Sequence, residues 1–255
     1  MRFGFRVLRL FCTTLSGDGQ TIYEMENGMI QERTALLIGE AGVARLAGCR
    51  VAVVGLGGVG GHCAEALARA GVGRLHLVDA DVVVESNLNR QLVATFATIG
   101  MKKTDAMAQR LAAVSHAEIT KADTFVLPDT LEAALPGDFD FLIDAIDTLA
   151  GKLALVMHCQ SRGIPMLSCM GAGNRLDAGR FAVRDIYETA GCPLARRMRS
   201  ELRKRGVPAL PVVFSDEPAH TAPGQTTIGS LAPVTATAGL LAADYAILQL
   251  LKAQP

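Results

Sequence analysis

Short strand-like runs and longer helical stretches alternate along most of this chain. The candidate strands, four to six residues each, lie at 51–54, 74–78, 117–121, 139–144 and 165–168. Before and between them, apolar residues recur at the three- and four-residue spacing of amphipathic helices, at 31–46, 62–70, 103–114 and 149–162. Strands that alternate with helices build a mostly parallel sheet with helices on both faces. The pattern therefore predicts a Rossmann-like α/β fold.

The pattern changes after residue 185, where a smaller α+β part is expected to complete the chain. Its expected elements are a basic helix at 193–205, a strand at 212–215, a functional or mobile loop at 216–230 and a closing helix within 231–251. We expect residues 29–185 to form the core. Residues 186–255 then belong to the same domain.

The closing helix is apolar enough to raise the question of a membrane span. It contains Pro233, several threonines and Asp244, and its large residues recur near helical spacing. We expect a buried core helix or a dimer helix, and no stable membrane insertion.

The first 28 residues differ from the rest of the chain. Arginines interrupt every short apolar run up to Cys12, which makes a poor signal peptide. Gly, Asp, Thr and Asn then dominate up to Gly28. We expect residues 1–28 to be disordered or to be an extension of the gene model.

Composition and charge place the chain among globular proteins. With 255 residues, 50% of them hydrophobic and 20% charged, it can bury a full core. The 25 basic and 25 acidic residues cancel, which alone predicts no polyanionic partner. Their distribution says more, because residues 196–205 hold six basic residues and one acidic residue. Such a helix is a candidate surface for nucleic-acid phosphates, or else an ordinary solvated helix face.

The six cysteines form no C-x-x-C pair. Structural zinc sites commonly draw on such pairs, so we expect no zinc site. Cys49, Cys63, Cys159 and Cys169 lie in apolar stretches, which is typical of reduced core residues in a cytoplasmic protein.

A glycine-rich loop follows the first strand. Gly55, Gly57 and Gly60 have G-x-G-x-x-G spacing, and a helical run begins at once. Such a loop turns backbone N–H groups and the positive end of a helix towards a phosphate. Asp79 comes about 20 residues later, where a carboxylate can bind a ribose hydroxyl.

Basic residues downstream separate two classes of nucleotide. A nicotinamide dinucleotide carries two phosphate charges, which loop amides and a helix end usually handle alone. Arg90, Lys102 and Lys103, beside two acidic residues and an amide-rich turn, better suit a triphosphate with its metal ion. The set therefore favours a site that breaks ATP over one that holds NAD.

Five motifs together resemble the ThiF/MoeB adenylating superfamily, which is related to ubiquitin-activating enzymes. They are G-L-G-G-V-G, D-A-D, S-N-L-N-R-Q, the lysine of M-K-K-T, and D-A-I-D. Stretches at 170–177, 185–189 and 192–199 narrow the resemblance to one branch, the tRNA threonylcarbamoyladenosine dehydratases (TcdA or CsdL). The similarity covers roughly residues 30–252.

The resemblance implies a role for each matching residue. Asp147 is expected to be the catalytic aspartate that associates with magnesium, while Arg90 and Lys103 act on the ATP phosphates. Arg33 is expected to reach into the ATP site of a partner subunit, which implies a homodimer; otherwise it is a surface residue at a helix start. The implied ATP-binding residues are Gly55, Gly57, Gly58, Gly60, Asp79, Asp81, Asn87 and Gln91. The implied tRNA-binding residues are Arg196, Arg197, Arg199, Arg203, Lys204 and Arg205.

Two residues have competing interpretations. Asp144 is either a second carboxylate of the ligand crevice or, as we favour, a cap of the helix at 149–162. Related activators use a cysteine for thioester chemistry, but Cys192 precedes Pro193 at an expected helix start, so we interpret it as structural or as a modest contributor.

The resemblance implies ATP-dependent dehydration of N6-threonylcarbamoyladenosine in tRNA, next to the anticodon, through a carboxyl-adenylate. Sulfur-transfer proteins are possible further partners. One alternative is an adenylyltransferase that activates a sulfur-carrier protein, although many such enzymes carry two C-x-x-C pairs. Another is a non-catalytic or NAD-binding Rossmann protein, which has no need of Asn87, Arg90, Lys103 and Asp147 together.

Overall fold

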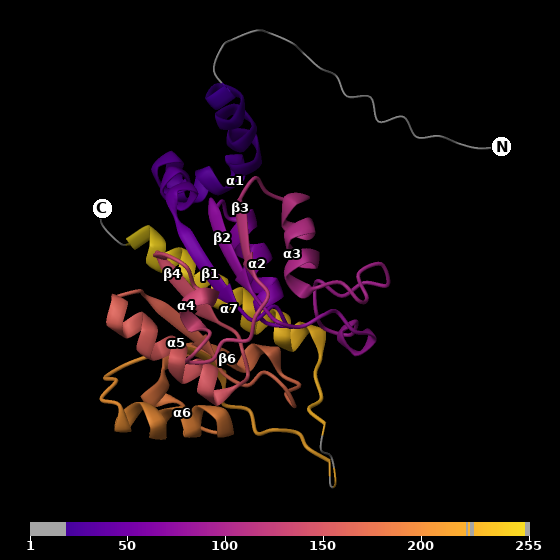
Figure 1. The fold of residues 1–255 in the computed structure, drawn as a ribbon, viewed down its shortest axis with the longest axis vertical. Helices are drawn as coiled ribbons and strands as arrows, with labels where there is room; N and C mark the ends of the chain where they lie inside the picture. The colour runs from indigo at the N-terminus through magenta and orange to yellow at the C-terminus, as the bar shows by residue number, and fades with distance from the viewer. Residues whose placement is uncertain (1–18, 223, 225–226, 253–255) are drawn as a thin grey trace, which may run out of the picture.

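The computed structural model describes residues 19–222, 224 and 227–252, and the side chains from residue 30 onward. In this part of the chain, seven strands form one sheet in the order β3-β2-β1-β4-β5-β7-β6 (Figure 1). All neighbouring pairs are parallel except β6 and β7. The strands are β1 (Arg50–Val54), β2 (Arg74–Val78), β3 (Glu118–Ala122), β4 (Phe141–Asp144), β5 (Met166–Cys169), β6 (Phe181–Asp185) and β7 (Pro211–Ser215). The predicted α/β fold with a mostly parallel sheet is confirmed.

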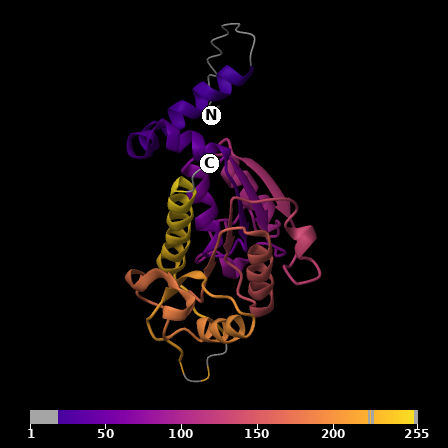
Figure 2. The same cartoon turned by 90° about the vertical axis from the view of Figure 1, so that its left-hand side faces the viewer.

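Helices cover both faces of the sheet, because successive strand residues point to opposite sides. Val51 and Val53 face one apolar core, and Ala52 and Val54 face the other. The first core is closed by α1 (Gly19–Gly48), α2 (Gly60–Arg69), α3 (Lys103–Ala112) and α7 (Ala232–Lys252). The second is closed by α4 (Leu131–Ala134), α5 (Leu149–Arg162) and α6 (Pro193–Lys204). Figure 2 shows α7 and α5 on opposite sides of the strands.

The strand order reverses between β1 and β4. From β1 the chain moves outward through β2 and β3, then returns to place β4 on the other side of β1. Loops that leave the carboxyl ends of β1 and β4 therefore diverge, and ligands of open α/β sheets bind in the crevice between them. The glycine loop after β1 and Asp147 after β4 both lie at this crevice.

Most elements lie within a few residues of their predicted bounds. Helix α5 spans 149–162 as predicted and ends where Gly163 adopts a left-handed conformation (φ 67°). The predicted helix at 31–46 is part of the longer α1, which is kinked at Gly39 (φ 72°). Residues 1–28 were expected to be disordered or an extension of the gene model. Of these, 1–18 lie outside the described residues, and 19–28 belong to α1.

The closing helix α7 is a core helix, as predicted. By length and composition it is the one helix in the described residues that is long and apolar enough to cross a membrane. Its buried side includes Val234, Ala238, Ala242 and Leu250, and it packs against α2 and the sheet. Gly239 permits this contact, since a Cβ there would lie 2.2 Å from the Val59 carbonyl oxygen.

The five described cysteines are all buried and free of disulfides. This confirms the prediction that Cys49, Cys63, Cys159 and Cys169 are core residues. Cys12 lies outside the described residues.

Candidate functional site

A cavity of about 640 Å³ opens at the carboxyl ends of β1, β2 and β4. Its walls are the glycine loop, the end of β2, the turn that follows, the start of α3, and the loops at 124–127 and 145–148. Most of the residues predicted for an ATP site line it: Gly55, Gly57, Gly58, Asp79, Asp81, Asn87, Arg90, Gln91, Lys103 and Asp147. We refer to this cavity as the nucleotide pocket.

The glycine loop is shaped by two close backbone approaches. Gly55 has a φ of 92°, and a Cβ there would lie 2.8 Å from the Ala145 backbone. A Cβ on Gly60 would lie 1.7 Å from the Gly55 carbonyl oxygen, so only glycine fits at this first residue of α2. Gly57 instead faces open space, with Gln91 the nearest group at 3.9 Å. The backbone is thus left bare where a phosphate has to approach it.

Gly58 lines the nucleotide pocket and also contacts the closing helix. A Cβ there would lie 2.9 Å from the Thr235 hydroxyl of α7, so this glycine also allows the loop to pack against the closing helix.

Asp79 ties the end of β2 to the glycine loop. One carboxylate oxygen accepts the Leu56 N–H at 2.6 Å and the other accepts the Asp81 N–H at 2.8 Å. Burial raises the pKa of Asp79, and Lys103 together with these hydrogen bonds acts against that rise. A carboxylate has about four acceptor positions, so Asp79 keeps capacity for a ribose hydroxyl.

Lys103, at the start of α3, is a nearly buried cation. Its ammonium lies 2.7 Å from an Asp81 carboxylate oxygen and 3.8 Å from an Asp79 carboxylate oxygen. Asp81 also accepts the Lys103 backbone N–H through its carbonyl, at 3.0 Å. Lys102 instead donates to Asp123 at 2.7 Å and does not line the pocket. Of the two lysines, only Lys103 is therefore placed to meet a nucleotide.

The turn after β2 holds the other polar groups. Arg90 donates to the Ser86 carbonyl at 3.0 Å and to the Asn89 amide oxygen at 2.9 Å, which keeps its guanidinium at the pocket. Asn87 accepts the Val84 N–H at 3.2 Å and so stabilises the turn. The buried Gln91 amide oxygen has no hydrogen-bond partner, as expected of a group that binds a ligand.

Two aspartates near the end of β4 have different surroundings. Asp147 is exposed and lines the pocket. Asp144 is fully buried, accepts a hydrogen bond from Ser168 at 2.6 Å and lies 3.1 Å from the Lys152 ammonium.

The prediction that Asp144 caps α5 is wrong. The N-cap position is Thr148, without a side-chain cap, and the Asp144 carboxylate is occupied by Lys152. The sequence did carry a signal for this pair, because Lys152 interrupts an otherwise apolar helical stretch.

The site suits a magnesium ion that arrives with ATP. Among the described residues, no group of three or more His, Cys, Asp or Glu side chains is arranged to hold a metal ion. Magnesium usually binds through one or two carboxylates plus the phosphates of its nucleotide, and keeps several waters. The exposed carboxylate of Asp147 fits that need.

Arg33 does not lie in the nucleotide pocket of its own chain. It is exposed on α1, where the neighbouring Gln31 donates to the Arg69 carbonyl at 3.1 Å. Arg69 ends α2, whereas the glycine loop precedes its start. The ten residues of α2 span about 15 Å, so Arg33 lies near the end of this helix that is remote from the glycine loop.

The basic residues of α6 are only partly free. Arg199 donates to the Thr189 hydroxyl, Lys204 and Arg205 each pair with Glu201, and Arg203 lies over the Tyr187 ring. Arg196 and Arg197 are exposed on the same helix. Five of the six predicted basic residues are therefore exposed, and of these Arg196 and Arg197 make none of the contacts just given.

Cys192 occupies the N-cap position of α6 and is buried in the second apolar core. A buried thiol has no path to a substrate carboxylate. This placement agrees with its interpretation as structural.

Comparison with known proteins gives consistent matches. The ThiF family model matches residues 31–255. A tRNA threonylcarbamoyladenosine dehydratase of Bacillus subtilis is 43% identical over 187 residues, covering 72% of this chain and 74% of that protein. The crystal structure of Escherichia coli TcdA with ATP aligns with a TM-score of 0.82 at 34% identity, covering 88% of this chain and 94% of the other. The E. coli molybdopterin-synthase adenylyltransferase is 35% identical over 144 residues, 56% of each protein.

Proposed function

The chain belongs to the ThiF family, and we propose that it uses ATP to remove water from N6-threonylcarbamoyladenosine in tRNA, next to the anticodon. One observation carries this proposal. The nucleotide pocket joins a bare glycine loop to the cations Arg90 and Lys103 and to the exposed Asp147. Relatives named for this reaction match over most of the chain, and one of them has been crystallised with ATP.

The chemistry explains why ATP is needed. The threonine moiety of the substrate carries a carboxylate, which is a poor electrophile because its leaving group would be oxide. Attack of this carboxylate on the α-phosphorus of ATP forms an acyl-adenylate and releases pyrophosphate. A nitrogen of the same modification then attacks the activated carbonyl, closes a five-membered ring and expels AMP. The nucleoside loses one water overall, and the ring closure gains from proximity without an enzyme nucleophile.

The described side chains suit the first of these steps. Arg90 and Lys103 place positive charge where pyrophosphate departs, and the glycine loop offers N–H groups to phosphate oxygens. Asp147 would hold the magnesium ion, which neutralises developing phosphate charge when bound. Lys103 enters the reaction already oriented by Asp81 and Asp79, so little reorganisation is required.

We propose that two copies of the chain form the functional unit. Arg33 is exposed and remote from the nucleotide pocket of its own chain, which leaves it free to enter the pocket of a partner. The exposed leucines Leu36 and Leu37 on the same helix supply apolar area for such a contact. An isologous dimer would provide two equivalent sites.

We further propose that α6 contacts the tRNA backbone, with the exposed Arg196 and Arg197 among the contacting charges. The buried, unbridged cysteines suit a reducing compartment, so we expect the enzyme to act in the cytoplasm. An interaction with sulfur-transfer proteins stays a prediction.

Mass spectrometry of nucleosides provides the test. Bulk tRNA that carries N6-threonylcarbamoyladenosine is incubated with the protein, ATP and magnesium. The product nucleoside should be one water lighter, with one AMP and one pyrophosphate released for each ring closed. Release of ADP and phosphate would rule out the mechanism. Turnover of ATP that depends on a sulfur-carrier protein instead of tRNA would favour the adenylyltransferase alternative.

A further inference from the structure

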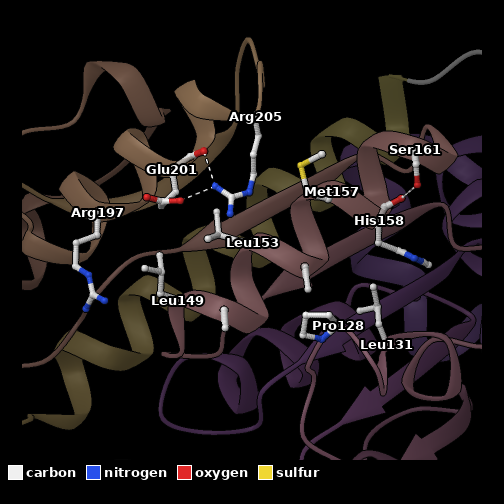
Figure 3. Close-up of a pocket in the computed structure, with 12 residues that line it drawn as sticks. Pro128, Leu131, Leu149, Leu153, Met157, His158, Ser161, Arg197, Glu201 and Arg205 are labelled. Carbon is white, nitrogen blue, oxygen red and sulfur yellow. Dashed lines mark hydrogen bonds and ion pairs between the residues drawn. The ribbon is translucent and has the colours of Figure 1, made fainter.

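A second cavity, of about 760 Å³, lies between α5 and α6 (Figure 3). Its floor is mostly apolar, formed by one side of α5 and by Pro128 and Leu131. Arg197 and Glu201 of α6, and Arg205 directly after this helix, stand along the opposite wall. The steps in the proposed function assign nothing to it. We refer to it as the α5–α6 pocket.

The α5–α6 pocket adjoins the nucleotide pocket along the chain at two points. Asp147 and Thr148 line the nucleotide pocket, and Leu149 and Ala150 line the α5–α6 pocket. Likewise, Leu127 lines the nucleotide pocket, and the next residue, Pro128, lines the α5–α6 pocket. Consecutive Cα atoms are about 3.8 Å apart, so the two cavities meet at these residues of the chain.

The lining suits a flat heteroaromatic group with a phosphate beside it. Leu149 and Leu153 offer apolar side chains, and an extruded base can pack between aromatic or apolar side chains. Figure 3 shows Arg197 at the end of the pocket where Leu149 lies, and Leu149 follows Asp147 by two residues in the sequence. Glu201 fixes Arg205 through an ion pair of 2.6 Å, whereas Arg197 is exposed and available to a phosphate.

The far end of the pocket contains a buried polar group without a partner. The Nε2 atom of His158 is buried and makes no hydrogen bond, while its Nδ1 atom lies 3.5 Å from Glu132. Burial lowers the pKa of His158, so the ring is neutral at neutral pH and keeps one nitrogen as an acceptor. This atom is covered by protein atoms, so the apolar lining and Arg197 are the groups that a ligand in the pocket would meet.

We infer that the α5–α6 pocket seats the base of the target nucleoside, the N6-modified adenine, after it leaves the stack of the anticodon loop. Its threonylcarbamoyl arm then passes Asp147 and delivers the carboxylate to ATP in the nucleotide pocket. Arg197 holds a phosphate next to the target. This inference rests on the proposed function and deepens it, because it assigns the substrate a place.

Filling the pocket tests the inference. Ala154→Trp and Met157→Trp each place an indole into the pocket, and Met157 lies at its partly exposed rim, where the fold tolerates the change. Gln160→Trp is the matched control, because Gln160 is exposed on the same helix and does not line the pocket. Each variant is assayed with an anticodon stem-loop that carries N6-threonylcarbamoyladenosine. Its ATP-induced thermal shift and its oligomeric state are measured in parallel.

We expect the pocket-filling variants to lower kcat/KM for the stem-loop at least tenfold, with the ATP-induced shift retained and Gln160→Trp unchanged. Normal kcat/KM in folded Ala154→Trp and Met157→Trp would overturn the inference and leave the proposed function intact. A change of oligomeric state in these variants, with normal activity per assembled unit, would instead make this face an interface between copies. No dehydration by the unaltered protein would overturn the proposed function and this inference with it.

Discussion

The Lys152 ammonium lies 3.1 Å from the Asp144 carboxylate, and both side chains are fully buried. The same ammonium donates to the Cys169 carbonyl at 2.7 Å, so it links α5, β4 and β5 below the loop that carries Asp147. Breaking one partner of a buried ion pair typically costs about 3–5 kcal/mol, because the other charge stays buried alone. We expect Lys152→Met to lower the free energy of unfolding by about that amount, as measured by urea denaturation.

The exposed pair of Lys204 and Glu201 provides the comparison for Lys152. Its ammonium and carboxylate are 2.6 Å apart on the surface of α6. Lys204→Met should change the free energy of unfolding by less than about 1 kcal/mol. Equal effects of the two substitutions would show that the buried pair contributes no more than a surface pair.

The second prediction separates Asp147 from Cys192. Asp147→Ala should reduce kcat for tRNA dehydration by about 10²–10³-fold or more, because the carboxylate that serves magnesium is lost. Cys192→Ser should retain substantial activity, since ring closure needs no enzyme thiol. Assays of the dehydrated nucleoside by mass spectrometry measure both. A covalent thioester trapped on Cys192 would contradict this mechanism.

The third prediction concerns the partner subunit. Arg33→Ala and Asp147→Ala should each be nearly inactive alone. If Arg33 acts in the pocket of the partner, mixed dimers of the two variants contain one site with both groups intact, and part of the activity returns. Subunit exchange is verified by native mass spectrometry. Failure to recover activity in exchanged dimers would place Arg33 outside the partner's site.

The fourth prediction tests α6 as the tRNA surface. Charge reversal at Arg196 should weaken tRNA binding and reduce the slope of log K against log salt, by about 0.7 to 0.9 for each phosphate that the protein no longer neutralises. The ATP affinity should not change. Arg184→Glu is a suitable control, because Arg184 is an exposed residue of β6 and not of α6. An unchanged salt slope would make α6 an ordinary solvated helix.

The fifth prediction compares nucleotides. ATP with magnesium should raise the thermal unfolding midpoint more than NAD at the same concentration, because Arg90 and Lys103 favour a triphosphate. Gly60→Ala should abolish the ATP effect, since its Cβ would meet the Gly55 carbonyl oxygen at 1.7 Å. Equal stabilisation of the unaltered protein by NAD would favour the alternative of an NAD-binding Rossmann protein.

Much of the fold was predictable because its elements are set locally. The bounds of α5 follow from a helical apolar pattern that ends at Gly163. The nucleotide pocket was predictable because Gly55 and Gly60 are required by close backbone approaches, which leave a sequence signature. The helix at 19–28 was not predicted, because Gly, Asp, Thr and Asn dominate the segment that leads to Gly28. The kink at Gly39 was not predicted either, because the apolar pattern at 31–46 continues through it.

Contacts between residues that are separated in the sequence could not be predicted. Asp144 looked like a helix cap because it precedes α5, and only the packing of α5 on β4 brings Lys152 to it. The orientation of Lys103 by Asp81 similarly depends on how α3 meets the end of β2. The α5–α6 pocket arises from the packing of α5 against α6, and no sequence motif marks it.

The buried thiols can report which part of the folded protein opens to solvent. Burial raises the pKa of Cys159 and of Cys169 to about 12, so the reactive thiolate is rare at neutral pH. A maleimide or other alkylating reagent can therefore reach these two cysteines only when the sheet and α5 separate. Cys159 lies on α5 and Cys169 ends β5, so the order in which they are alkylated reports which part of the molecule opens first. If substrate binding closes this region, alkylation of both should slow before any product is formed.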